Sequence, residues 1–130
     1  MAVLGFTTVS SLLKEQSEMV KAKGIEAYGV SVLDDSDGKH EPIRTSNAQL
    51  HLFMQIKRGN VTHMLFQSAE QVEIFFSNME AYYGKEKADG FLKPLRFISV
   101  ADSKDALSSR GLDSIDAEDM PAALSQLSME

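Results

Sequence analysis

The sequence predicts an α+β domain with an antiparallel sheet around a central hairpin, two helices packed mainly on one face, and a flexible acidic C-terminal tail. Three observations lead to this prediction: two segments with helical apolar spacing, an alternating stretch with a short polar turn inside it, and a change of composition after residue 101. At 130 residues the chain is long enough for one buried core and short for two ordinary domains.

The first predicted element is a helix over residues 8–23. Its apolar side chains recur at helical spacing, and Gly24 stands where a left-handed residue commonly ends a helix. Residues 25–33 are rich in β-branched side chains and predict a strand. Residues 40–45 predict a short return strand, which Pro42 confines to an edge of the sheet because proline lacks an N–H donor.

Residues 49–57 and 61–67 predict the central hairpin, because apolar and polar side chains alternate along both stretches. A three-residue loop at 58–60 matches the apolar faces of the two strands and places Phe53 opposite Leu65. Phe53 and Leu65 then point away from the face that the helices cover. The other face carries the apolar side chains expected in the core: Leu50, Leu52, Met54, Ile56, Met64 and Phe66.

A second helix is predicted to begin at Ser68, where Ser68 and Gln71 have the spacing of a capping box. A last strand follows over residues 95–100. We therefore predict an α+β domain at 1–101 and a partly disordered tail at 102–130. One short helix is expected near the end of the tail, with Pro121 in its first turn.

The net charge of −6 is concentrated at the C-terminus, where residues 102–130 carry seven acidic and two basic side chains. The remaining 101 residues are nearly neutral, which disfavours nucleic-acid binding without excluding it. The chain contains no cysteine and no apolar stretch long enough to span a membrane, and its first residues do not form a signal peptide. We expect a cytoplasmic protein that does not interact with membranes.

No motif predicts a catalytic, metal or cofactor site. The stretch LDDSDG resembles the start of a calcium loop, but aligning Gly38 with the loop glycine puts Leu33 and Arg44 at ligand positions. It is therefore interpreted as a turn. In the hairpin register, His51 and His63 lie about 13 Å apart along the strands, too far to share one metal ion. We expect that the protein is not an enzyme, and an enzyme using these histidines ranks last among the hypotheses.

The sequence instead predicts a noncatalytic protein-binding module, regulatory or chaperone-like, that acts through an exposed sheet face and the acidic tail. The candidate partner-binding residues are Phe53, Leu65, Lys57 and Arg58. The partner is another protein or a second copy of the chain in a homodimer. Coverage of Phe53 and Leu65 by the tail is the structural alternative. The functional alternative is a single-stranded nucleic-acid-binding protein in which Lys57 and Arg58 contact phosphates and the acidic tail inhibits binding.

Overall fold

The computed structural model describes residues 2–129, in which strands and helices alternate along the chain. The strands are β1 (Val3–Val9), β2 (Glu26–Asp34), β3 (Glu41–Pro42), β4 (His63–Phe66), β5 (Arg96–Val100) and β6 (Ser114–Ala117). The α-helices are α1 (Leu13–Ala22), α2 (Asn47–Lys57), α3 (Ala69–Tyr83), α4 (Lys85–Leu92), α5 (Ser103–Ser109) and α6 (Met120–Ser128). A short 3-10 turn, η1 (Ser36–Gly38), connects β2 to β3.

The strands form one sheet in the order β3-β2-β1-β4-β5-β6. Only β3 is antiparallel to its neighbour, and the other five strands are parallel. If β3 is left out and the five parallel strands are renumbered in chain order, their spatial order is 2-1-3-4-5. This is the flavodoxin-like order of a doubly wound α/β sheet. Chain order and spatial order diverge at the centre, where β1 lies between β2 and β4.

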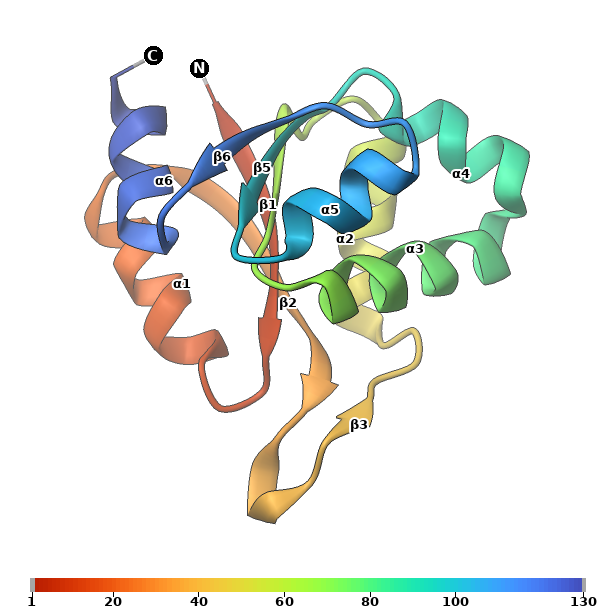
Figure 1. The fold of residues 1–130 in the computed structure, drawn as a ribbon, viewed down its shortest axis with the longest axis horizontal. Coiled ribbons are helices and arrows are strands. Elements are labelled where there is room, and N and C mark those ends of the chain that lie inside the picture. The colour runs from red at the N-terminus through yellow and green to blue at the C-terminus, as the bar shows by residue number, and fades with distance from the viewer. Residues whose placement is uncertain (1, 130) are drawn as a thin grey trace.

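Helices cover both faces of the sheet (Figure 1). On one face, α2 to α5 enclose a core that includes Leu52, Phe75 and Leu107. On the other face, α1 and α6 contribute Val20 and Leu124 to a second core. Every residue of β4 is buried, because its side chains alternate between the two cores. This burial on both faces explains why the strand has a continuous apolar run at Met64, Leu65 and Phe66.

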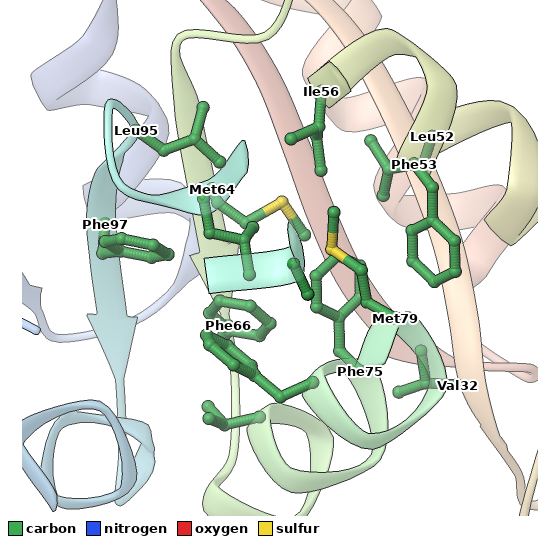
Figure 2. Packing of buried hydrophobic residues seen from close by; sticks show 14 of the residues in the cluster. Val32, Leu52, Phe53, Ile56, Met64, Phe66, Phe75, Met79, Leu95 and Phe97 are labelled. Atoms are coloured by element: carbon green, nitrogen blue, oxygen red, sulfur yellow. The ribbon is translucent and has the colours of Figure 1, made fainter. Parts of the chain in front are cut away.

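The larger core contains several aromatic rings between α3 and the sheet (Figure 2). The Phe75 ring lies 5.4 Å from the rings of both Phe53 and Phe66, in edge-to-face geometry. Phe66 also stacks on Phe97 of the neighbouring strand, with 6.3 Å between ring centroids. Such offset and edge-to-face pairs are favourable beyond the apolar area that they bury. This core joins α2 and α3 to the middle of the sheet.

Several local predictions are confirmed by the structure. Ser68 is the N-cap of α3, and its hydroxyl accepts a hydrogen bond from the Gln71 N–H at 3.1 Å. The predicted strands at 25–33 and 95–100 correspond to β2 and β5. Pro42 lies on the edge strand β3, and Pro121 lies in the first turn of α6. The stretch LDDSDG forms the end of β2 and the turn η1, as interpreted.

The predicted α+β fold with an antiparallel hairpin is wrong. Residues 49–57 belong to helix α2, whose N-cap Ser46 accepts a hydrogen bond from the Gln49 N–H. The buried side chains of α2 include Leu52, Phe53 and Ile56, a helical set, while Met54 is 43% exposed. Residues 63–66 do form a strand, but β4 pairs in parallel with β1 and β5. The alternation over 50–56 is therefore also compatible with a helix, which the tertiary structure selects.

The prediction of a flexible acidic tail is also wrong, since residues 102–129 form α5, β6 and α6. Strand β6 extends the sheet in parallel beside β5, with Ile98 opposite Ile115. Leu107 and Leu124 are fully buried, one in each core. Polar residues that suggested disorder lie at the ends of these elements. For example, Asp119 accepts a hydrogen bond from the Ala122 N–H at the start of α6. Glu130, counted among the acidic side chains above, lies outside the described residues.

None of the helices in residues 2–129 is both long enough and apolar enough to cross a membrane.

Candidate functional site

The candidate site lies at the carboxyl edge of the sheet, between β1 and β4. The chain leaves β1 for α1 on one face of the sheet and leaves β4 for α3 on the other face. The two connections diverge at adjacent strands, and this point in an open α/β sheet is where ligands characteristically bind. Figure 1 shows this edge at the lower end of β1, above the projecting β2–β3 connection.

The loop between β1 and α1 binds a carboxylate of the chain itself, that of Asp35, which directly follows β2. Asp35 accepts hydrogen bonds from the Ser11 N–H at 2.9 Å and from the hydroxyl groups of Ser10 and Ser11. The Ser11 hydroxyl, the Ser11 N–H and the Ser10 hydroxyl together lower the pKa of Asp35. The carboxylate is therefore ionised at neutral pH, and it fills the position just before α1 where an anion would otherwise be favoured.

Asp34 adds a second fixed negative charge next to Asp35. Hydrogen bonds from the hydroxyl and the N–H of Ser36 lower the pKa of Asp34, and Ser10 contributes a further hydroxyl donor at 3.1 Å. These bonds also join the end of β2 to the β1–α1 loop. The two carboxylates therefore have a structural role and define the charge of this side of the edge.

Glutamine and threonine side chains form a hydrogen-bonded network beneath the carboxyl ends of β1 and β4. The carboxamides of Gln16 and Gln67 exchange two hydrogen bonds, at 3.0 and 2.8 Å, and Gln67 also donates to the Thr7 carbonyl. The Thr7 hydroxyl donates to Gln71 at 2.8 Å. Thr7, Gln16 and Gln71 are buried, so this network satisfies polar groups that would be costly to leave without partners.

The loop after β5 completes the edge and holds an unusual backbone conformation. Ala101 has φ = +56°, in the left-handed region that residues with a Cβ seldom adopt. Asp102 accepts the first N–H of α3, from Ala69, at 2.8 Å. The buried Ser103 hydroxyl donates to the Phe66 carbonyl and accepts the Val100 N–H. These bonds fix the ends of β4 and β5 relative to each other.

The exposed rim of this edge is predominantly acidic. A protein carboxylate lies at the start of both α1 and α3, supplied by Asp35 and Asp102. Both helix N-termini at the divergence point are therefore already neutralised by the chain itself. Hydrogen-bond acceptors dominate the rim, so donor groups of a ligand are favoured there. The acidic side chains of this edge include Asp34, Asp35, Glu70, Asp102, Glu118 and Asp119, and the nearby cations include Lys14, Lys39 and Lys104.

The structure does not bring the four predicted partner-binding residues together at an exposed sheet face. Phe53 and Leu65 are fully buried, Phe53 in the core under α2 and α3, and Leu65 in the core under α1 and α6. The predicted exposure of this pair is therefore wrong, because a doubly wound sheet is covered on both faces. Lys57 and Arg58 are exposed, at the C-terminal end of α2 and the opposite, amino edge of the sheet.

The nucleic-acid hypothesis loses the aromatic residue that was expected to stack a base, because Phe53 is inaccessible. His51 lies on α2 against Tyr28, with 5.5 Å between ring centroids, and His63 is buried at the start of β4. Within residues 2–129, no cluster of three or more His, Asp or Glu side chains has the arrangement needed to hold a metal ion.

Sequence reasoning missed the residues of the carboxyl edge. Their signal is a polar residue directly after an apolar stretch, which occurs at Ser10, Asp34, Gln67 and Asp102. These positions converge only when the strands are parallel, because parallel strands end at the same edge of a sheet. The predicted fold instead placed Ser10 inside a helix, Asp34 before a turn, Gln67 at the end of a hairpin strand and Asp102 at the start of a tail, so the repeated signal was not recognised.

The fold and the position of this edge define a doubly wound α/β domain in which ligands are expected at the carboxyl ends of the strands. The sequence matches no protein-family model and none of the curated proteins. Among solved structures, the chain is similar to a mutant uroporphyrinogen III synthase from the extremely thermophilic bacterium Thermus thermophilus, with a TM-score of 0.55 and 18% sequence identity. The alignment covers 95% of this chain and 48% of the other, so this chain spans about half of that protein's length. At this identity the similarity shows the fold alone.

The comparison corrects the expectation that the protein is not an enzyme. That expectation depended on an open antiparallel sheet and on the absence of a catalytic motif. The fold is instead that of a structure whose name is that of an enzyme, and in doubly wound folds the site is built from loop residues that need no continuous motif.

Proposed function

We propose that the chain is a ligand-binding domain that holds a small molecule over its carboxyl edge and supplies one half of a catalytic unit. The observation that carries the proposal is the divergence of the β1–α1 and β4–α3 connections at adjacent central strands. The similarity to about half of an enzyme supports the second part. The remaining half of the unit would come from another domain or a second copy of the chain.

The name of the similar enzyme suggests a first ligand to test, a porphyrinogen. Such a molecule combines pyrrole N–H donors with carboxylate groups. The Asp35 carboxylate suits N–H donors, whereas Asp102 and the rest of the acidic rim repel the ligand's own carboxylates. We therefore expect weak binding to this half alone, with affinity that increases when a rim charge is removed.

The test is a titration with uroporphyrinogen III under anaerobic conditions, which preserve its pyrrole N–H groups, followed by amide chemical shifts in NMR. We expect shifts at residues 10–11, 34–35, 67–69 and 101–103. Benzene-1,2,4,5-tetracarboxylate is a control that carries carboxylates on an aromatic ring without pyrrole N–H groups, and it should leave these amides unchanged. Shifts confined to other surfaces would overturn the placement of the site.

Asp102→Asn provides a second test of the same placement. Asparagine keeps an oxygen for the Ala69 N–H and removes one rim charge, so affinity for uroporphyrinogen III should rise roughly twofold to fivefold at low salt. Asp113→Asn, at the opposite edge before β6, is the charge-matched control and should have no effect. Equal affinity in wild type and Asp102→Asn would contradict binding over this edge.

A protein partner is the second candidate, and it is supported by the fixed negative charge of Asp34 and Asp35 at an exposed edge. A basic protein surface would be steered to this rim, with strong salt dependence. A regulatory role, a homodimer and a cytoplasmic location stay predictions. Sedimentation equilibrium measures self-association directly, and a monomer at a protein concentration of about 0.1 mM would exclude a stable homodimer.

A further inference from the structure

A groove on the exposed side of α3 has the features of a second ligand site. It lies between α3 and the segment that follows β3, and Figure 1 shows this segment passing beside α3 on its way to α2. Its volume is about 690 Å3, within the range of small-molecule pockets. Residues of both walls line it, among them Arg44 and Thr45 of the segment and Glu73, Ile74, Ser77 and Ala81 of α3.

The wall formed by the segment is fixed on both sides of Arg44. The Ile43 N–H donates to a carbonyl of β2 at 2.8 Å, and the Ile43 carbonyl accepts a hydrogen bond from the Asn78 side chain of α3 at 2.9 Å. Ser46 is the N-cap of α2. Arg44 and Thr45 therefore lie between two anchored residues. The groove is largely formed before a ligand arrives, which lowers the entropic cost of binding.

The wall formed by α3 is hollow because most of its exposed side chains here are small. Glu73, Ser77 and Ala81 are four residues apart, so they lie along one side of the helix over about 12 Å. Ser77 and Ala81 leave space beside Ile74, which is half-buried and packs against the larger core. An apolar group placed against Ile74 would gain the usual stabilisation from leaving water.

The segment brings a free cation to the groove. Arg44 is exposed, and no ion pair or hydrogen bond among residues 2–129 involves its guanidinium. A guanidinium presents a planar set of N–H donors that matches a carboxylate. The hydroxyl groups of Thr45 and Ser77 line the same groove and can add neutral donors. A carboxylate is therefore favoured on this side of the groove.

The α3 side of the groove carries an excess of negative charge. The Arg110 guanidinium lies between two carboxylates, 3.0 Å from that of Glu73 and 3.5 Å from that of Glu80. One positive and two negative charges leave this cluster with a net charge of −1. Glu73 lines the groove and its side chain is 58% exposed, so its carboxylate can accept a further hydrogen bond from an ammonium group.

We propose that this groove binds a small zwitterion with an apolar group, such as an apolar amino acid or a short apolar peptide. The carboxylate contacts Arg44, the ammonium group contacts Glu73, and the apolar group lies against Ile74. Two opposite charges on one ligand match two opposite charges of the groove, which discriminates against molecules that carry only one of them. The groove shares no lining residue with the carboxyl edge, so this inference does not depend on the proposed function.

L-Leucine, 4-methylpentanoate and 3-methylbutylamine are matched probes, because the second lacks the ammonium group of leucine and the third lacks its carboxylate. In an NMR titration we expect leucine to shift the amides of residues 43–45 and 73–81, with a dissociation constant of about 1–10 mM. Each single-charge probe should bind at least about fivefold more weakly, since it loses a hydrogen bond between charged groups.

Leucyl-leucine, in which the two charges are further apart, distinguishes a peptide ligand from a free amino acid by its affinity relative to leucine. Three outcomes would overturn the proposal: no binding of either zwitterion, equal binding of leucine and a single-charge probe, or amide shifts confined to other residues.

Two variants remove the charges of the groove one at a time. Arg44→Gln should weaken leucine about fivefold without weakening 3-methylbutylamine, which has no carboxylate. Glu73→Gln should weaken leucine about fivefold without weakening 4-methylpentanoate, which has no ammonium group. Arg58→Gln and Glu86→Gln, at exposed positions outside the groove, are charge-matched controls and should change none of these affinities. Circular dichroism verifies that each variant is folded. Unchanged leucine affinity in folded Arg44→Gln would refute the assignment of the carboxylate.

Discussion

Replacement of Phe53 by alanine tests the fold most directly, because the hairpin and the helix give opposite expectations. On the outer face of a hairpin, Phe53 would be a surface residue and its removal would change stability little. In the structure it is fully buried on α2, with the rings of Phe75 at 5.4 Å and Tyr83 at 6.3 Å. Deletion of a buried phenylalanine to alanine costs about 3–5 kcal/mol of unfolding free energy. The two ring pairs place Phe53 in the upper part of that range.

The assay is urea unfolding followed by circular dichroism in the far ultraviolet. A loss of about 4 kcal/mol with a slope of roughly 2 kcal/mol per molar urea lowers the unfolding midpoint by about 2 M. Such a loss is a large part of the total stability of a domain, which is about 5–15 kcal/mol. Met54→Ala is the matched control, because Met54 is the next residue of the same helix and is 43% exposed. Its midpoint should change by less than about 0.3 M.

The comparison of these two variants decides between the two folds. Equal midpoints for Phe53→Ala and Met54→Ala would refute the buried position of Phe53 and with it the assignment of residues 47–57 to a helix over the core.

Three further changes test the loops and the close contacts. Ala101→Gly should raise the unfolding free energy by about 0.5–1 kcal/mol in urea unfolding, because glycine adopts φ = +56° without the Cβ penalty. Gly29→Ala should lower it by about 1–3 kcal/mol, because the added Cβ would lie 2.3 Å from the Phe6 ring. Asp35→Asn should make the free energy of unfolding fall less steeply as the pH is lowered. Bonds from Ser11 lower the folded pKa of Asp35 below its usual value of 3.8, so its contribution is present above that pH and is lost as the pH falls through the folded pKa.

Matched controls accompany each of these changes. Ala81→Gly, at an exposed helical position of α3, should lower stability by about 1 kcal/mol, opposite in sign to Ala101→Gly. Gly90→Ala in α4 meets no atom within 4 Å and should stabilise by up to about 1 kcal/mol. Asp113→Asn controls for the removed charge in urea midpoints at pH values of about 6, 4 and 3. Agreement between any variant and its control in sign and size would contradict the structural reason given for it.

The candidate site shows the limit of sequence patterns in a doubly wound fold. Asp35 and Ser11 are 24 positions apart in the chain, and Asp102 and Ala69 are 33 apart, yet each pair is hydrogen-bonded. Nothing in their spacing marks them as partners, because their proximity depends on which strands are neighbours. The turn at residues 36–38 was predictable from local composition. The hydrogen bonds that Ser10 and Ser11 of the β1–α1 loop donate to Asp35 were not.

Local rules in the sequence determined the capped start of α3 at Ser68, the strand β2, the edge position of Pro42 and the first turn of α6. Each depends on side chains within a few residues, so short-range chemistry decides it. Tertiary structure decided the direction of the strands, the helical state of α2, and the folding of residues 102–129 into α5, β6 and α6. These depend on long-range burial: the apolar run of β4 and the alternation over 50–56 fit more than one secondary structure locally, and only coverage of both sheet faces selects one of them.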